Sequence, residues 1–437
     1  MSHRCGTLRG GRIGGGPVFR FVHAADVHLD SPLRGLERYE GAPADRVRGA
    51  TRRALEALVD MAVEEKAAFV LLSGDVFDGE WRDYKTGLFF VDQMARLGRA
   101  GIRVFVLRGN HDPASRSKTL RFPQNVHEFG SRRAGTERIP EIGVAIHGRS
   151  FPEGAVTEDL SATYPDPVSG LLNVGMLHTS LSGRPGHAPY APCTADGLAA
   201  KGYDYWALGH VHQREVVRES PHVVFPGNLQ GRHVRETGSK GCSLVTVEDG
   251  RIAAVEHRPL CVLRWAVRDV DAGGAATPDD VLGRVREAID DEVRRPPGCS
   301  VAVRVRVLGA CPAHPLLVRD AARWREEVRA VATDAGRGDA WVEKVQIATR
   351  SPLDLDEMER RDDALGGLLR RVRAIGGDAG SLAALAPELE DLRQKLPHDL
   401  ACADDPLRLD DPAYLRQAIE IARDILATRL HDRGDDR

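Results

Sequence analysis

Five short stretches of this sequence place chemically active side chains directly after a run of apolar residues. One of them is Gly109-Asn110-His111-Asp112, which follows the apolar run from Val104 to Leu107. The other four stretches supply aspartate and histidine: Asp26-Val27-His28, Gly74-Asp75-Val76-Phe77-Asp78, His178, and Gly209-His210-Val211-His212. Carboxylate, imidazole and amide oxygen are together a suitable ligand set for divalent metals such as Mn, Fe and Zn. The pattern therefore predicts a metal site.

Each of these stretches marks the predicted end of a β-strand. The apolar runs before them are short and bounded by turn residues, as in strands that are covered on both faces. In open α/β sheets, ligands bind beyond the carboxyl ends of the strands. A single Asp-x-His or Gly-Asp occurs by chance in many chains, and a histidine after a strand is usually a loop residue. Five such strand ends in succession indicate one shared site.

A site of this kind suits the hydrolysis of phosphoesters. One carboxylate can bridge two ions, and two ions about 3.5 to 4 Å apart hold a hydroxide near neutral pH and clamp the attacking and leaving oxygens. Thiolates are not part of the pattern, because the seven cysteines are scattered without paired spacing. We interpret these cysteines as reduced and mostly structural, which fits a reducing compartment.

Over about residues 19 to 260, the order of the motifs resembles that of the calcineurin-like metallophosphoesterases. The resemblance implies two divalent metal ions, with Asp75 as the bridging ligand. It also implies a general acid, His111, that is oriented by Asp112. The ligands implied for one metal are Asp26, His28, Asp75 and His212, and those implied for the other are Asp75, Asn110, His178 and His210.

Three segments are similar to the bacterial DNA-repair exonucleases of the SbcD and YhaO type: residues 23–33, 73–78 and 226–233. This resemblance implies a phosphodiesterase that cleaves DNA as the exonuclease subunit of a repair complex. Mn²⁺ is the metal we expect, with Fe, Zn and Mg as alternatives. A hydroxide held by the metals would attack the phosphodiester, and His111 would protonate the leaving oxygen. Eukaryotic and archaeal relatives carry a histidine where this chain has Asp78, so the role of that histidine is not carried over.

The partners that the resemblance implies are DNA, an SMC-like coiled-coil ATPase and, as a further candidate, a second copy of the chain. The ATPase contact is expected near the C-terminus, where a helix that starts at Asp411-Pro412 carries an apolar stripe. The same stripe could instead pack on its own domain. The loop-rich part after the Asn110 motif carries the basic residues Arg116, Lys118, Arg121, Arg132 and Arg133, and the first three of them are the predicted DNA contacts.

Two other functions stay open. The chain could be a phosphodiesterase or phosphatase for small nucleotides or phosphoproteins, because the metal chemistry is shared and only the surroundings select the substrate. It could also be a non-catalytic DNA-binding adaptor subunit. The complete ligand set and the presence of His111 argue against the adaptor.

The composition sets outer limits on the class of protein. The chain has 437 residues, of which 42% are hydrophobic and 29% charged, so two or three ordinary globular domains are expected. A net charge of −3 excludes a globally basic nucleic-acid coat but leaves room for local basic patches. No apolar stretch is long enough to span a bilayer, and the Gly- and Arg-rich N-terminus is not a secretory signal. We expect a cytoplasmic protein.

The predicted fold class is α/β, a calcineurin-like metallophosphoesterase sandwich of two packed sheets flanked by helices. A β-α-β rhythm between residues 19 and 107 predicts parallel strands, and Asp249-Gly250 predicts a later hairpin. A helix should begin at Thr277-Pro278, and another should span about Pro315 to Val331. We expect a flexible N-terminal tail, a nuclease domain, an α+β capping domain and a helical C-terminal region, over residues 1–17, 18–262, 263–350 and 351–437.

Overall fold

The computed structural model describes residues 18–31, 49–79, 84–112, 120–182, 189–295 and 299–378, together with 380–382, 384–385, 389–390, 395, 409 and 411–435. The predicted N-terminal tail lies outside these ranges. By its contacts the chain divides into two compact units. The first takes in residues 1–266 and 295–302, and the second takes in 267–294 and 303–437. The boundaries predicted for the capping domain and the helical region stay a prediction.

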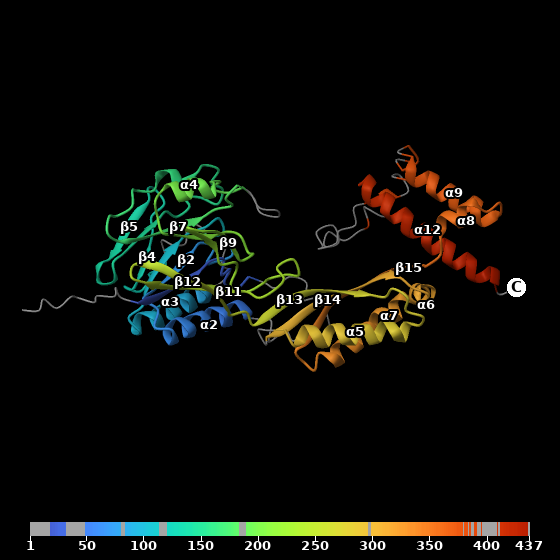
Figure 1. Cartoon of the computed structure of the whole chain (residues 1–437), viewed down its shortest axis with the longest axis horizontal. Coiled ribbons are helices and arrows are strands. Elements are labelled where there is room, and N and C mark those ends of the chain that lie inside the picture. The colour runs from blue at the N-terminus through green and yellow to red at the C-terminus, as the bar shows by residue number, and fades with distance from the viewer. Residues whose placement is uncertain are drawn as a thin grey trace, which may run out of the picture. The chain divides into compact units, whose positions relative to one another are not determined.

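The first unit contains two six-stranded sheets (Figure 1). The first sheet has the strand order β12-β11-β1-β2-β3-β4. Its strands are β1 (Phe19–Ala24), β2 (Phe69–Ser73), β3 (Arg103–Leu107), β4 (Val126–Glu128), β11 (Gly241–Glu248) and β12 (Arg251–Pro259). Strands β1 to β4 run parallel, as the β-α-β rhythm predicts. The antiparallel pair β11 and β12 is the predicted hairpin.

The second sheet has the strand order β5-β6-β7-β8-β10-β9. Its strands are β5 (Gly135–Ile139), β6 (Val144–Gly148), β7 (Leu172–His178), β8 (Tyr205–Gly209), β9 (Glu215–Glu219) and β10 (His222–Phe225). The four central strands are parallel, and the two edge strands β5 and β9 are antiparallel to their neighbours. Both sheets therefore present several carboxyl strand ends, which is where the predicted site residues lie.

A fully buried apolar layer joins the two sheets. It includes residues of both sheets, among them Phe21, Phe69, Phe105, Val174, Met176 and Tyr205. The rings of Phe21 and Phe69 stack with centroids 4.8 Å apart. Burying each large apolar side chain contributes roughly 1.5 to 3 kcal/mol, so this layer holds the sheets firmly together. The strand ends of one sheet are thereby fixed relative to those of the other.

Helices cover the outer faces of the first unit. Helices α2 (Ala50–Glu64) and α3 (Tyr84–Arg99) pack with the first sheet, and the short helix α4 (Ala195–Ala200) packs with the second. In Figure 1 the labels α2 and α3 lie below the strands of this unit, and α4 lies above them. The predicted sandwich of two sheets flanked by helices is confirmed.

The second unit contains most of the three-stranded sheet β13-β14-β15 and the helices that follow its strands. The strands are β13 (Leu263–Asp271), β14 (Ser300–Ala310) and β15 (Ala340–Arg350). Helix α5 (Pro278–Val293) begins where predicted, because Thr277 and Asp280 form a capping box and proline stands at the first helical position. The apolar stripe of α5 is buried at Val281, Val285 and Ile289.

The predicted helix from Pro315 to Val331 is wrong as a single element. The structure has two helices there, α6 (His314–Arg319) and α7 (Ala321–Ala335). Asp320 separates them with φ −132° and ψ 58°, outside the helical region, and its carboxylate accepts a hydrogen bond from the Arg323 N–H. Aspartate favours such a cap over a place inside a helix, and this preference breaks the apolar periodicity.

The described C-terminal elements are helical. They include α8 (Leu355–Arg360), α9 (Ala364–Gly377) and α12 (Pro412–Asp435), and α12 begins at the predicted proline. Leu415 and Ala427 of α12 are buried, whereas Ile421 is 55% exposed. Leu415, a member of the predicted apolar stripe, thus packs within its own unit. Within the described residues, we find no helix with the length and apolar character needed to cross a membrane.

Candidate metal centre

The predicted site residues all lie at or just past the carboxyl ends of five parallel strands. They are Asp26 and His28 after β1, Asp75 after β2, Asn110, His111 and Asp112 after β3, His178 at the end of β7, and His210 and His212 after β8. Strands β1 to β3 belong to the first sheet, and β7 and β8 belong to the second. The site therefore requires both sheets, packed as they are.

Four of these residues have a left-handed backbone conformation. The φ angles are 52° at Asp26, 45° at His28, 51° at Asp75 and 98° at His210. Positive φ is uncommon for residues other than glycine, and a bulky side chain there carries strain. Such strain persists where the surrounding structure fixes it, and it clusters at functional sites. The sharp turns aim these side chains inward from the strand ends.

Two motif glycines are required by the close packing of this centre. A Cβ atom at Gly109 would collide with the carboxylate of Asp75, and a Cβ atom at Gly74 would collide with the ring of His178. Gly74 also has φ 93°, which favours glycine. The glycines that precede aspartate and asparagine in these motifs therefore leave space for the ligands themselves.

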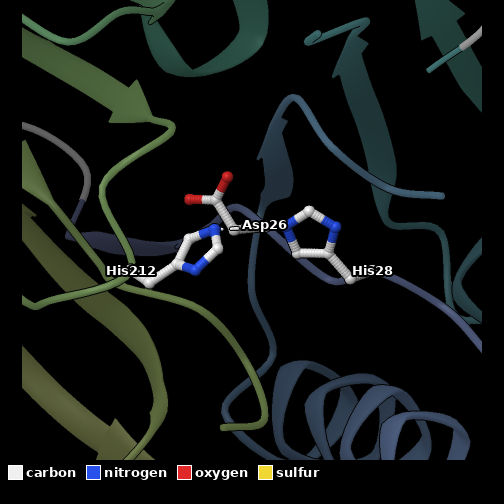
Figure 2. Close-up of side chains that lie close together, drawn as sticks. All are labelled: Asp26, His28 and His212. Atoms are coloured by element: carbon white, nitrogen blue, oxygen red, sulfur yellow. Dashed lines mark hydrogen bonds between the residues drawn. The ribbon is translucent and has the colours of Figure 1, made fainter. Parts of the chain in front are cut away.

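Asp26, His28 and His212 form one group of side chains that could hold a metal ion (Figure 2). The two imidazole Nε2 atoms lie 3.2 Å apart, although the residues are separated by 184 positions in the sequence. Asp26 and His28 are fully buried. Burial lowers the pKa of His212 to about 4 and also lowers the pKa of His28. Both imidazoles are therefore neutral near pH 7, the form that binds a metal.

Asp75, His178 and His210 form a second group, and the side-chain oxygen of Asn110 joins it. Asn110 Oδ1 lies 3.0 Å from His178 Nε2 and 3.1 Å from His210 Nδ1. The Nδ1 of His178 lies 2.9 Å from the backbone oxygen of Ser73 and donates its proton there. In the neutral ring, Nε2 then carries a lone pair that faces the acceptor Asn110 Oδ1. Two acceptors this close need a proton or a metal cation between them, so the donor set fits a metal ion.

Asp75 lies between the two groups. Its Oδ2 is 3.5 Å from His178 Nε2 and 3.9 Å from His28 Nε2. Its Oδ1 accepts a hydrogen bond of 2.8 Å from the backbone N–H of His111, which fixes the carboxylate. A carboxylate held in this place has the geometry that a ligand shared by two ions needs.

The charges of the centre are unbalanced without cations. Burial raises the pKa of Asp26 to about 8, and the charge of Asp75 adds to this effect. Burial would also raise the pKa of Asp75, but the charge and hydrogen bond of His178, together with the charges of His28 and His111, outweigh burial and lower it. Burial alone would lower the pKa of His178, but Asp75 raises it to about 9. A proton on His178 thus occupies the position that a divalent ion would take.

Glu236 is a site residue that the motifs did not reveal. Its carboxylate accepts a hydrogen bond of 2.7 Å from His212 Nδ1, which leaves Nε2 of that ring directed at His28. The carboxylate also accepts hydrogen bonds from Asn228 Nδ2 and the backbone N–H of Arg232. Such an outer carboxylate fixes the tautomer of a ligating histidine and increases its basicity. Glu236 lies three residues beyond segment 226–233, and no motif points to it.

We expect Glu236→Gln to weaken metal binding about 10- to 100-fold, because the neutral amide no longer polarises His212. Calorimetric titration of the metal-free protein with Mn²⁺ measures the change. Glu248→Gln removes a charge from an exposed residue at the end of β11 and serves as the matched control. Equal affinity in both variants would contradict the supporting role of Glu236.

His111 has a different partner from the one expected. Its Nδ1 lies 3.0 Å from Asp78 Oδ1, and the same oxygen lies 3.5 Å from His28 Nδ1 and 3.7 Å from Arg232 Nη1. The His111 side chain is 42% exposed, so a substrate can reach it. The hydrogen bond to Asp78 raises the pKa of His111. Asp78 belongs to a motif, but nothing in the motif spacing predicts its contact with His111.

Asp112 acts on the backbone instead. Its carboxylate accepts hydrogen bonds from the N–H groups of Val76, Phe77 and Gly109, at 3.3, 2.9 and 2.9 Å. These bonds tie the loop after β2 to the loop after β3. The expectation that Asp112 orients His111 is therefore corrected: Asp112 shapes the turn, and Asp78 contacts the imidazole.

Two family models match the chain. Residues 19–214 match the calcineurin-like phosphoesterases, and residues 265–350 match the middle domain of the metallophosphoesterase YhaO. The uncharacterized metallophosphoesterase YhaO of Bacillus subtilis is 38% identical over 297 residues, which are 67% of this chain and 72% of that protein. The DNA double-strand break repair protein Mre11 of Methanopyrus kandleri is 26% identical, over 80% of this chain and 75% of its own length. The Mre11 protein of Aeropyrum pernix is 34% identical, over 54% of this chain and 60% of its own length.

Proposed function

Because the chain belongs to the calcineurin-like metallophosphoesterases, a family of metal-dependent hydrolases of phosphoester bonds, we propose that it is a dinuclear phosphodiesterase that cleaves DNA. The observation that carries the proposal is the position of Asp75 Oδ2 between two groups of buried ligands, at 3.5 Å from His178 and 3.9 Å from His28. We further propose that the protein is the exonuclease subunit of a repair complex and that its metal is Mn²⁺.

The proposed ligands follow two of the three groups of described side chains that could hold a metal ion; the third group, His28, Asp78 and His111, contains the proposed general acid. One ion would be held by Asp26, His28, Asp75 and His212, and the other by Asp75, Asn110, His178 and His210. Bound divalent ions would supply an activated water near neutral pH and neutralise charge on the phosphate. Asp75 contributes the shared carboxylate, and the backbone N–H of His111 keeps it in place.

His111 is the proposed general acid. It is exposed beside the buried ligands, and Asp78 holds its ring through Nδ1 and keeps it protonated to higher pH. The free Nε2 is then the donor that would deliver a proton to the leaving sugar oxygen. Positioned general acids of this kind contribute about 10² to 10⁴ in rate.

DNA as the substrate is supported by the relatives that are named as DNA double-strand break repair proteins. The decisive experiment compares Mn²⁺-dependent cleavage of linear duplex DNA, circular single-stranded DNA and bis-p-nitrophenyl phosphate by the full chain. Cleavage of linear DNA from its ends, together with hydrolysis of the nitrophenyl diester, is the expected result. Rapid hydrolysis of a small nucleotide without cleavage of either DNA would reject DNA as the substrate. If the protein hydrolyses none of these substrates, the proposal that it is a phosphodiesterase is rejected.

Binding to DNA should depend steeply on salt. Each phosphate that a basic side chain neutralises contributes about 0.9 to the slope of log affinity against log salt concentration. Of the predicted DNA contacts, Arg121 is exposed, and Arg116 and Lys118 lie outside the described residues. Arg132 and Arg133 of the same loop-rich part are exposed as well. Replacing the three described arginines by alanine should lower the slope by about 1 to 3. Fluorescence anisotropy at several salt concentrations measures it.

The control for this experiment removes equal charge elsewhere. Arg251, Arg286 and Arg294 are also exposed, so their triple alanine variant should keep the wild-type slope. An equal drop of the slope in both triple variants would mean that only total charge matters. In that case the cluster around Arg121 would not be a DNA contact.

We propose a coiled-coil SMC-like ATPase as the partner of the C-terminal region. Ile421 of α12 is 55% exposed, whereas Leu415 of the same helix is buried. Ile421→Asp should therefore leave the melting temperature and bis-p-nitrophenyl phosphate turnover unchanged while it removes ATP-stimulated DNA cleavage by the reconstituted complex. Unchanged ATP stimulation would place the contact elsewhere. Assembly into homodimers and a cytoplasmic location stay predictions.

A further inference from the structure

Two cysteines far apart in the sequence meet in the first unit. The sulfur atoms of Cys261 and Cys299 lie 3.7 Å apart, although the residues are 38 positions apart. Both residues belong to the part of the chain that clusters as the first unit. The expectation that the cysteines are mostly structural does not anticipate this contact, because neither cysteine stands in a paired motif.

We propose that Cys261 and Cys299 are a redox-active pair that forms a reversible disulfide with a small hydroperoxide as the oxidant. A disulfide requires a sulfur–sulfur distance of about 2.05 Å, so the two atoms must approach by less than about 2 Å. Rotation of the side chains can cover most of such a distance. In reducing compartments, disulfides of this kind are transient and serve redox sensing or catalysis. Neither cysteine belongs to a group of candidate metal ligands among the described residues.

The backbone keeps Cys261 in a defined place. Its N–H donates to the backbone oxygen of Lys240 at 3.2 Å, and the N–H of Leu260 donates to the same oxygen at 2.9 Å. Cys299 directly precedes strand β14, whose first residue is Ser300. Both cysteines are therefore attached to ordered strands or to the segment beside them, so their contact is a stable feature of the folded unit.

The environment favours a reactive thiolate at Cys261. The hydrogen bond between the two sulfurs lowers the pKa of Cys261 to about 7, and the charge of Arg264 acts in the same direction. The thiolate is the nucleophilic form of cysteine. Cys261 is 7% exposed and Cys299 is partly exposed, so a water-sized oxidant can reach the pair from the side of Cys299.

The chemistry proceeds in two balanced steps. The Cys261 thiolate attacks one oxygen of the hydroperoxide, an S–O bond forms, the O–O bond breaks, and the leaving oxygen departs as hydroxide or alkoxide and takes up a proton. Cys261 is then a sulfenic acid. The Cys299 sulfur attacks the Cys261 sulfur, the S–S bond forms, and the S–O bond breaks. Hydroxide leaves and takes the thiol proton to give water. Two thiols are oxidised, and one peroxide is reduced.

The test is mass spectrometry of the full chain after reduction, treatment with hydrogen peroxide and alkylation of the remaining thiols. The expected result is two fewer alkyl groups per chain than in the reduced, untreated control, a peptide pair joined through Cys261 and Cys299, and its disappearance with dithiothreitol. If both cysteines remain fully alkylated after treatment, or if Cys261 goes directly to sulfinic acid without a linked peptide, the proposal is overturned.

Two variants separate the roles of the two sulfurs. In Cys299→Ser, Cys261 has no partner to resolve it, so its sulfenic acid should accumulate and be trapped by dimedone. In Cys193→Ser, the cross-link should form as in the wild type. Cys193 is a suitable control because it is 6% exposed, nearly the same as Cys261. A linked peptide that contains Cys193 in the wild type would reject the assignment. Loss of the Cys261–Cys299 link in Cys193→Ser would reject it as well.

Discussion

Asp75→Asn is expected to take the protein from two bound metal ions per chain towards none and to reduce DNA cleavage to background. Asp75 is the proposed ligand that both ions share, and its Oδ2 lies within 3.9 Å of a histidine from each group. Asparagine has the same size, and its oxygen can still accept the hydrogen bond from the His111 N–H. The substitution therefore removes the charge and the bridge while it keeps the packing. Elemental analysis and activity, measured on the same sample, test the prediction.

Two comparisons make this result specific. His28→Ala should mainly weaken one ion, because His28 belongs to the group with Asp26 and His212. Asp30→Asn removes a nearby carboxylate that pairs with Arg52, outside both groups, and it should keep both ions. If Asp75→Asn still binds two metal ions and turns over normally, the assignment of Asp75 as the shared ligand is rejected.

His111→Ala should bind metal normally and slow the cleavage of DNA by about 10² to 10⁴. The reason is that His111 is not among the proposed ligands, while its exposed ring lies beside them and can donate a proton. A substrate whose leaving group needs no proton should show a smaller loss of rate in this variant. Hydrolysis of bis-p-nitrophenyl phosphate should therefore fall much less than cleavage of DNA. Equal losses on both substrates would assign His111 another task.

The rate of DNA cleavage should also depend on pH through His111. Asp78 raises the pKa of His111, so the protonated acid persists to higher pH, and activity is lost as the pH rises through that raised pKa. Asp78→Asn removes this support. The basic limb of the pH–rate profile should then move to lower pH, while metal content stays near that of the wild type. A profile that does not move would mean that Asp78 does not tune His111.

The sequence alone determined the fold class and the elements that form the centre. Short apolar runs that end in glycine, aspartate, asparagine or histidine predict strands and their ends, because burial on both faces requires continuous apolar residues. Parallel strands bring their carboxyl ends to one edge, so Asp26, Asp75 and Asn110 could be expected to converge. The helix start at Thr277-Pro278 and the hairpin at Asp249-Gly250 were equally predictable, because capping and turn preferences act over a few residues.

Which side chains contact each other depends on the tertiary structure. Asp78, rather than Asp112, pairs with His111, because positive φ at Asp75 and the three backbone bonds to Asp112 set the course of the two loops. The contacts of Glu236 with His212 and of Cys261 with Cys299 join residues 24 and 38 positions apart. No local periodicity encodes such contacts. They follow from how two sheets pack and where irregular loops return, and these depend on the whole unit.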